Sequence, residues 1–327
     1  MPIIHIGYPK TASTWFQKAF YPHLKSPRYI GRDAIKAALA DWNALDFDPA
    51  ALREKLGLGE DERGLISEEG LCGYLHNGGV GGMVSMVFAQ QLKAAYPDAR
   101  IVIFIRSQPA MLVAAYAQYV RSGGTRSARR YFFPKDYLIG PNAATYKQPR
   151  FDIDFFRYSR LIELYERLFG PANVRVFLYE EFATGGPDFL RRYAKDLNLE
   201  VDWEAVSIDR RHSSYSLGLM QAARAMNLLT ARSVSDKASL LHVPGWYEAR
   251  RVLLEGINRS GLAGRSPSLE RLVGKRTARW LAEYYVDDNR ALAKARKLPL
   301  AEFGYPMEAS GTVERARPAS WRKVFRW

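Results

Sequence analysis

The chain has 327 residues, of which 47% are apolar and 25% charged, the balance of a globular protein able to bury a large core. Lysine and arginine outnumber aspartate and glutamate by 48 to 34, a net charge of +14. Such a field favours anionic ligands, namely nucleotides, acidic polysaccharides or nucleic acid. Cys72 is the single cysteine, which excludes an intrachain disulfide and predicts a cytoplasmic protein.

The beginning of the sequence, MPIIHIGYPK, lacks the basic and long apolar regions of a signal peptide. No apolar run reaches the roughly 18–20 residues that a membrane span needs. We therefore expect neither secretion by that route nor a transmembrane helix.

The predicted elements alternate between strands and helices. Residues 3–6 predict a strand that ends at Gly7 and leads through YPKTAST into a helix that ends near Pro22. Residues 33–56 read as mixed helix and loop. The expected later strands are 64–67, 100–105 and 174–179, the glycine-rich loop is 76–82, and the expected helices are 83–95, 109–121, 155–169, 187–197, 214–230, 247–258 and 268–296.

This alternation predicts an α/β fold with a central parallel sheet flanked by helices, a P-loop-like nucleotide-binding fold. We expect a single domain over 1–327. Residues 122–150 are rich in arginine, glycine and proline and predict a loop or lid beside the site. Its aromatic residues could stack on sugar rings or bases; they are Tyr131, Phe132, Phe133, Tyr137 and Tyr146. Residues 307–327 form a C-terminal tail.

The loop after the first strand has the composition of an anion site. A strand that feeds a short loop into a helix points backbone N–H groups outward, where the helix dipole favours negative charge. Lys10 adds a mobile positive charge, and Thr11, Ser13 and Thr14 add hydroxyl donors. A Walker A loop would need its lysine after the second glycine of G-x-x-x-x-G-K-[ST], and this loop does not fit that pattern.

Residues 9–15 resemble the 5′-phosphosulfate loop of the sulfotransferase family, PK(S/T)G(T/S)TW, with Ala12 in place of the usual glycine. The second family hallmark is a strand that ends in arginine, with a serine eight residues later. IVIFIR ends at Arg106, but position 114 is alanine. Ser107 and Ser122 are the candidates to replace that serine in binding the 3′-phosphate.

Other segments resemble the family in the expected order along most of the chain. VRVFLYEEF resembles a strand ending in Tyr-Glu-Asp, which implies that Tyr179 contacts adenine. RHSSYSLGLMQAARAMN and YYVDDNRALA resemble segments of bacterial members. WRKVF resembles the end of the loop that closes over the nucleotide, and Arg315 and Arg317 supply its basic residues.

The resemblance implies transfer of a sulfuryl group from 3′-phosphoadenosine 5′-phosphosulfate (PAPS) to a hydroxyl or amine. Lys10 would stabilise the leaving oxygen, and Trp15 could stack on adenine. Residues implied in binding the donor are Pro9, Lys10, Thr11, Ala12, Ser13, Thr14, Trp15, Arg106, Tyr179, Arg315 and Arg317. Arg106 also stands at the carboxyl end of a central strand, where open α/β sheets bind ligands.

The acceptor needs a base within hydrogen-bond reach. LISEEGL resembles the Ser-Ser-Glu segment of bacterial members, which selects Glu69, with Glu68 second and His76 as the other candidate. No cluster of residues has metal-ligand spacing, so we expect no metal. We expect a small-molecule, carbohydrate or peptide acceptor that could be acidic, with a bacterial carbohydrate or secondary metabolite favoured.

Three alternatives stay open. A P-loop small-molecule kinase would need a Walker lysine and an acidic strand end for Mg²⁺. A basic nucleic-acid-binding protein would bind with a steep salt dependence, although no known nucleic-acid motif is present and we expect no nucleic-acid partner. A relative without catalysis would only bind a nucleotide, which the alanine at position 114 keeps open.

Overall fold

The computed structural model describes residues 1–40, 43–134, 150–207, 215–230, 238–259 and 267–309. Its centre is a sheet of five strands in the order β3, β4, β1, β5, β6, and each pairing is parallel. The strands are β1 (Ile3–Gly7), β3 (Arg28–Ile30), β4 (Gly64–Ser67), β5 (Arg100–Ile105) and β6 (Val174–Leu178). A separate antiparallel pair joins β2 (Leu24–Ser26) to β7 (Glu200–Val201). The predicted parallel α/β sheet is confirmed.

Alternate side chains of the strands enter two hydrophobic cores, one on each face of the sheet. Ile4, Ile66 and Ile103 belong to the larger core, which also includes residues of α5, α6 and α8. Val102 and Phe104 belong to the smaller core with the aromatic residues that follow the first loop and line α9. Burial on both faces explains why β5 reads as a continuous apolar run, RIVIFI.

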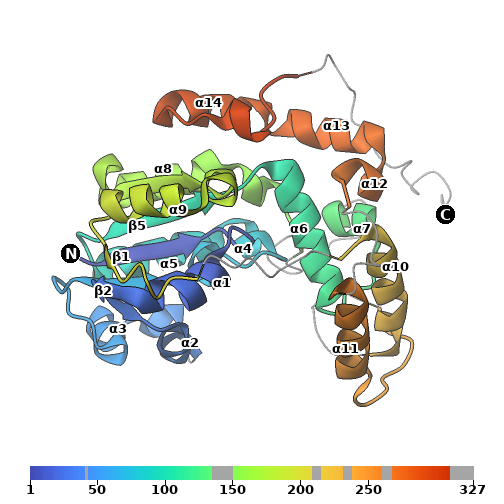
Figure 1. Cartoon of the computed structure of the whole chain (residues 1–327), viewed down its shortest axis with the longest axis horizontal. Coiled ribbons are helices and arrows are strands. Elements are labelled where there is room, and N and C mark those ends of the chain that lie inside the picture. Colours follow the sequence, from blue (N-terminus) through green and yellow to red (C-terminus); the bar gives the residue numbers. More distant parts are fainter. Residues whose placement is uncertain (41–42, 135–149, 208–214, 231–237, 260–266, 310–327) are drawn as a thin grey trace.

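Helices surround this sheet (Figure 1). In chain order they are α1 (Ser13–Trp15), α2 (Arg32–Ala40), α3 (Pro49–Leu56), α4 (Gly78–Gly81), α5 (Met83–Ala95), α6 (Gln108–Arg121), α7 (Ala128–Phe132), α8 (Tyr158–Phe169), α9 (Tyr179–Asp196), α10 (Leu217–Met226), α11 (Trp246–Arg259), α12 (Leu269–Val273), α13 (Lys275–Tyr284) and α14 (Val286–Arg296).

 A single π-type turn, Phe16–Phe20, continues α1.

The structure departs from the sequence predictions at two helical segments and one strand. The segment 268–296 is three helices, because Gly274 adopts φ 84° between α12 and α13, and a further break at Tyr285 separates α13 from α14. Helix α9 begins at Tyr179, well before residue 187, and a non-helical Gly186 precedes Pro187 inside it. The edge strand β3 was not predicted, because its three residues, RYI, form no apolar run.

The order of connections in the parallel sheet switches between the neighbouring strands β1 and β5. The connection from β1 leads to β3 on one side, whereas the connection from β5 leads to β6 on the other. Ligands of open α/β sheets bind beyond the carboxyl ends of the strands at such a switch point. Helices α6, α7, α10 and α11 gather at that end of the sheet (Figure 1). The fold therefore places the loop after β1 where a ligand is expected.

Several predictions fall outside the described residues, namely those on Tyr137, Tyr146, Arg315, Arg317 and most of the tail 307–327. Among the described residues, no helix is long and apolar enough to cross a membrane. The single-domain assignment over 1–327 stays a prediction.

Candidate active site

The loop between β1 and α1 exposes backbone donors. Lys10 and Ala12 adopt left-handed conformations, with φ 68° and 70°. In the described part of the chain, no group accepts a hydrogen bond from the backbone N–H of residues 10–13. Alternating left-handed residues turn successive N–H groups toward one concave side, which forms an anion-binding nest. Ala12 pays a steric cost in this conformation that glycine would avoid.

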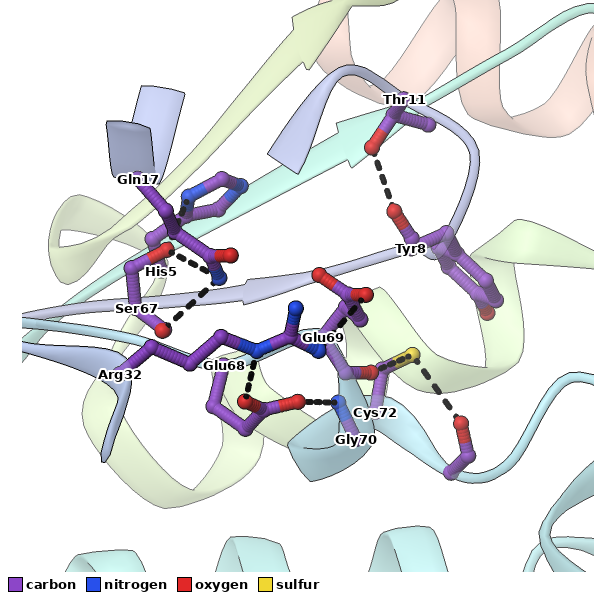
Figure 2. A network of polar contacts seen from close by, with 11 residues as sticks. His5, Tyr8, Thr11, Gln17, Arg32, Ser67, Glu68, Glu69, Gly70 and Cys72 are labelled. Carbon is purple, nitrogen blue, oxygen red and sulfur yellow. Dashed lines mark hydrogen bonds and ion pairs between the residues drawn. The ribbon is translucent and has the colours of Figure 1, made fainter. Parts of the chain in front are cut away.

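Hydroxyl groups of the loop are less available than the sequence suggested. Thr11 is fully buried, and its hydroxyl donates to the Tyr8 carbonyl, as Figure 2 shows. Ser13 is also buried, and Thr14 is partly exposed. Thr11 would therefore serve an anion through its backbone N–H, and its side chain holds the loop together.

The structure brings Lys10 and Arg106 together across the switch point. Arg106 follows β5 and donates from Nη1 to the Lys10 carbonyl at 3.0 Å. Its guanidinium also lies over the ring of Tyr179, 4.4 Å from the centroid, and its Nε is buried without a partner. Burial lowers the pKa of Lys10; the positive charge of Arg121 lowers it further, and Glu69 raises it. Arg106 therefore keeps N–H groups from which an anionic ligand could accept hydrogen bonds.

Neither serine proposed to replace the missing one at position 114 is suitably placed. Ser107 donates its hydroxyl proton to the Gly304 carbonyl at 2.8 Å, and its N–H donates to Glu180. Ser122 lies beyond the far end of α6, a 14-residue helix that spans about 20 Å. Ala114 is buried inside α6. Arg106 is therefore the 3′-phosphate candidate that the described part of this region retains.

Glu68 and Glu69 directly follow β4 and share one arginine, Arg32, as Figure 2 shows. Arg32 Nε lies 3.0 Å from Glu68 Oε2, and Nη2 lies 3.1 Å from Glu69 Oε1. The other Glu68 oxygen accepts from the Gly70 N–H at 3.0 Å, whereas Glu69 Oε2 is buried without a partner. Glu68 thus uses both oxygens in the fold, and Glu69 keeps one for a ligand.

Gly7 lets Glu69 approach the phosphate loop. A Cβ built on Gly7 would lie 3.1 Å from both Cα and Cβ of Glu69, and Gly7 adopts φ 94°. Glycine alone fits this close approach without strain. The backbone of Glu69 therefore packs directly against the start of the loop that carries Lys10.

His76 is buried between aromatic rings. Its Nδ1 lies 2.6 Å from the Tyr131 hydroxyl, and its Nε2 is buried without a partner. Burial, and to a smaller extent the positive charge of Lys10, lower the pKa of His76 to about 4. The imidazole is therefore neutral at pH 7, and it lies close enough to Lys10 to feel its charge.

A second polar network, drawn in Figure 2, ties the first helical turn to β4. Gln17 Nε2 donates to the carbonyl and to the hydroxyl oxygen of Ser67, at 3.0 and 3.3 Å. The Ser67 hydroxyl lies 3.0 Å from Nδ1 of His5, which is fully buried. Sequence reasoning missed Arg32, Gln17 and Ser67. A polar residue at the end of an apolar strand was the available signal for Ser67.

Several aromatic rings that were expected to stack on a ligand pack against other side chains of the protein. Trp15 packs against Phe20 and Phe182, with ring centroids 6.2 and 4.9 Å away. Tyr131 and Phe132 are 2% exposed, so they are not surface rings for sugar stacking. That expectation was wrong for both residues, because α7 turns them into the hydrophobic core.

No group of three or more His, Cys, Asp or Glu residues within the described ranges could hold a metal ion.

Neither a protein-family model nor a curated protein matches the sequence. Among solved structures, the chain is similar to a sulfotransferase from Alicyclobacillus acidocaldarius, with 21% identity over 64% of this chain and 76% of that chain and a TM-score of 0.36. It is also similar to mouse sulfotransferase SULT7A1 in complex with PAP, with 13% identity over 86% and 87% of the two chains and a TM-score of 0.35. At these scores the likenesses assign neither a family nor an activity.

Proposed function

We propose that the chain is a sulfotransferase that uses PAPS as its donor. The observation that carries the proposal is the loop PKTASTW, which lies at the switch point of a parallel sheet with Lys10 and Arg106 in contact. This combination supports binding of a nucleotide with anionic groups at both ends of its ribose. A carbohydrate or a secondary metabolite is the acceptor class that we favour.

The donor would lie across the carboxyl ends of β1 and β5. Backbone N–H groups of residues 10–13 would bind the 5′-phosphate, since the described chain leaves them without acceptors. Arg106 would bind the 3′-phosphate, and Tyr179, already against its guanidinium, would contact adenine. A fully charged guanidinium suits a phosphate because its planar fork can donate two parallel hydrogen bonds.

Transfer would proceed by in-line displacement at sulfur. The acceptor oxygen forms a bond to sulfur as the bond from sulfur to the bridging phosphate oxygen breaks, which leaves adenosine 3′,5′-bisphosphate (PAP). Lys10 would stabilise the negative charge that develops on that bridging oxygen. Catalysis of this kind depends on positioning and on electrostatic stabilisation of the moving charge.

Glu69 would take the proton from the acceptor. Its Oε2 is buried without a partner, whereas both oxygens of Glu68 already accept hydrogen bonds. Arg32 holds the other oxygen of Glu69, so one oxygen is fixed and one is left to accept the acceptor's proton. The depressed pKa of His76 makes it a weak base, although its neutral ring could still orient an acceptor group.

Calorimetric titration with PAP, beside ATP without magnesium, tests the donor site. We expect PAP to bind much more tightly than ATP, and Arg106→Ala to lose PAP binding. Arg28→Ala, which replaces an exposed arginine paired with Glu62, is the matched control and should bind PAP as the wild type does. Equal binding of PAP and ATP would refute the proposed donor.

A further inference from the structure

A buried arginine lies at the end of α6, away from the donor loop. Arg250 of α11 is 0% exposed, and it donates from Nη2 to the Arg121 carbonyl at 2.9 Å. Its Nε and Nη1 are buried and have no partner. Its guanidinium lies over the Tyr247 ring, 4.7 Å from the centroid. In a guanidinium, Nε carries one N–H donor and each terminal nitrogen carries two. Three of the five donors of Arg250 are therefore on nitrogens without a partner.

Tyr215, which lies beside Arg121, also has an unsatisfied polar group. Tyr215 is 4% exposed, and its hydroxyl is buried without a partner. The guanidinium of Arg121 lies over the Tyr215 ring, 5.9 Å from the centroid, and pairs with Glu255 at 2.6 Å. Arg250 and Arg121 both act on the pKa of Tyr215, whose net direction is upward because of burial. Donors from α11, α6 and the entry to α10 therefore meet at one place.

An unpaired buried charge is expensive. A guanidinium removed from water needs an anion or a full set of acceptors to offset the lost hydration. Glu255 pairs with Arg121, and no carboxylate in the described chain lies within ion-pair distance of Arg250. Since buried polar groups are almost always satisfied, an anion is the ligand whose chemistry suits this cluster.

The cluster is connected electrostatically to the catalytic loop. After burial, the positive charge of Arg121 is the largest cause of the lowered pKa of Lys10. Arg106 and Lys10 would serve the donor, whereas Arg250 and Tyr215 make no contact with the donor loop among the bonds of the described residues. An anion bound by Arg250 would therefore lie outside the proposed donor site.

We propose that Arg250, Tyr215 and Arg121 bind an anionic group of the acceptor, a carboxylate or a sulfate ester. The inference rests on the proposed transfer reaction for its link to an acceptor, while the anion site stands on the geometry of these three residues. The acceptor is then an acidic molecule whose reacting hydroxyl lies toward Glu69 and whose anionic group lies toward α11.

Calorimetric titration of the full chain with sodium sulfate tests the anion site. PAP is titrated first and kept in excess, and sodium chloride holds the ionic strength constant. We expect saturable sulfate binding by the wild type, about tenfold weaker binding by Tyr215→Phe, and none by Arg250→Met. Tyr215→Phe removes one hydroxyl and keeps the ring, so it tests the site even if Arg250→Met does not fold.

Arg251→Met is the matched control, because Arg251 is the exposed neighbour on the same helix and pairs with Glu248. It should bind sulfate as the wild type does. Absence of saturable sulfate binding in the wild type, or equal affinity in all variants, would overturn the anion site. Failure of PAP to bind in the first titration would instead refute the proposed donor, and the dependence of sulfate binding on Tyr215 would still decide the anion site.

A second titration assigns the site to an acceptor or to a free anion. The probes are 4-hydroxybenzoate and 4-hydroxybenzamide, which differ mainly in charge, each added to the PAP-saturated protein. We expect the carboxylate to bind at least about tenfold more tightly, and Tyr215→Phe to reduce that ratio. Equal or undetectable binding of the two probes, with sulfate still bound, would overturn the assignment to an acceptor.

Discussion

Lys10 is partly buried, and its carbonyl accepts a hydrogen bond from Arg106. Its pKa is lowered by burial and by Arg121, and Arg106 lowers it as well. Lys10→Ala should reduce turnover with PAPS by about 10²–10³-fold, because one donor aimed at developing charge contributes that much. PAPS turnover measured as PAP release gives the result. Lys18→Ala, an exposed lysine a short distance along the chain, should leave the rate unchanged. Wild-type turnover in Lys10→Ala would remove Lys10 from the mechanism.

Glu68 and Glu69 form a natural pair of matched variants. Glu69→Gln should slow transfer strongly and leave PAP affinity near that of the wild type, because Glu69 Oε2 has no structural partner. Glu68→Gln should mainly lower the free energy of unfolding, by about 1–3 kcal/mol, because its carboxylate accepts from both Arg32 and Gly70. Turnover and urea unfolding, measured on both variants, separate the roles. A reversed pattern would make Glu68 the base.

Sequence could nominate these two residues but could not separate them. Both follow the same buried strand, and both are glutamates. The difference arises from Arg32, which lies more than thirty residues earlier and reaches them because β3 pairs with β4. The same holds for Arg250, whose lack of partners depends on how α11 packs near the end of α6. Long-range packing of this kind leaves no local pattern in the chain.

The loop after β1 stores strain at Ala12. This residue adopts φ 70° at the point where the chain enters α1, a conformation that costs a non-glycine residue about 1 kcal/mol. Ala12→Gly should therefore raise the free energy of unfolding, or leave it unchanged where the added freedom of the unfolded chain offsets the gain. It should also keep PAP binding. Urea unfolding and calorimetry give both values, and a loss of more than about 1 kcal/mol would contradict the strained conformation.

Strands and the helices directly beside them were predictable because buried parallel strands are continuous apolar runs. β4 and β5 have the predicted bounds, and α5 matches residue for residue. The helices at 268–296 were not separable, because no proline interrupts the segment and its two breaks are single residues, Gly274 with φ 84° and Tyr285. Tyr179 was expected at a strand end but begins α9, so the end of a strand and the start of a helix were harder to tell apart than their interiors.

Two buried histidines make the free energy of unfolding depend on pH. His5 lies within β1 against Phe16 and Phe104, and burial lowers its pKa to about 3. His76 is buried beside the Tyr131 hydroxyl, and its pKa is lowered to about 4. Each is neutral in the folded chain and takes up a proton near its ordinary pKa of 6.5 once unfolded. The unfolded state thus binds more protons below that value, so stability falls as pH drops from about 6.5 toward 4.

Between pH 7 and pH 5, each of these histidines should remove about 2 kcal/mol of unfolding free energy, at 1.36 kcal/mol per pH unit below 6.5. His76→Gln should lower this pH-dependent loss by its share, whatever the variant does to stability at pH 7, because glutamine does not titrate. His23→Gln, which replaces a histidine that is not buried, is the control and should keep the full loss. Urea unfolding of the three proteins at both pH values measures the difference. An unchanged loss in His76→Gln would show that His76 is accessible to protons in the folded chain, and would then weaken its assignment as a neutral ring beside Lys10.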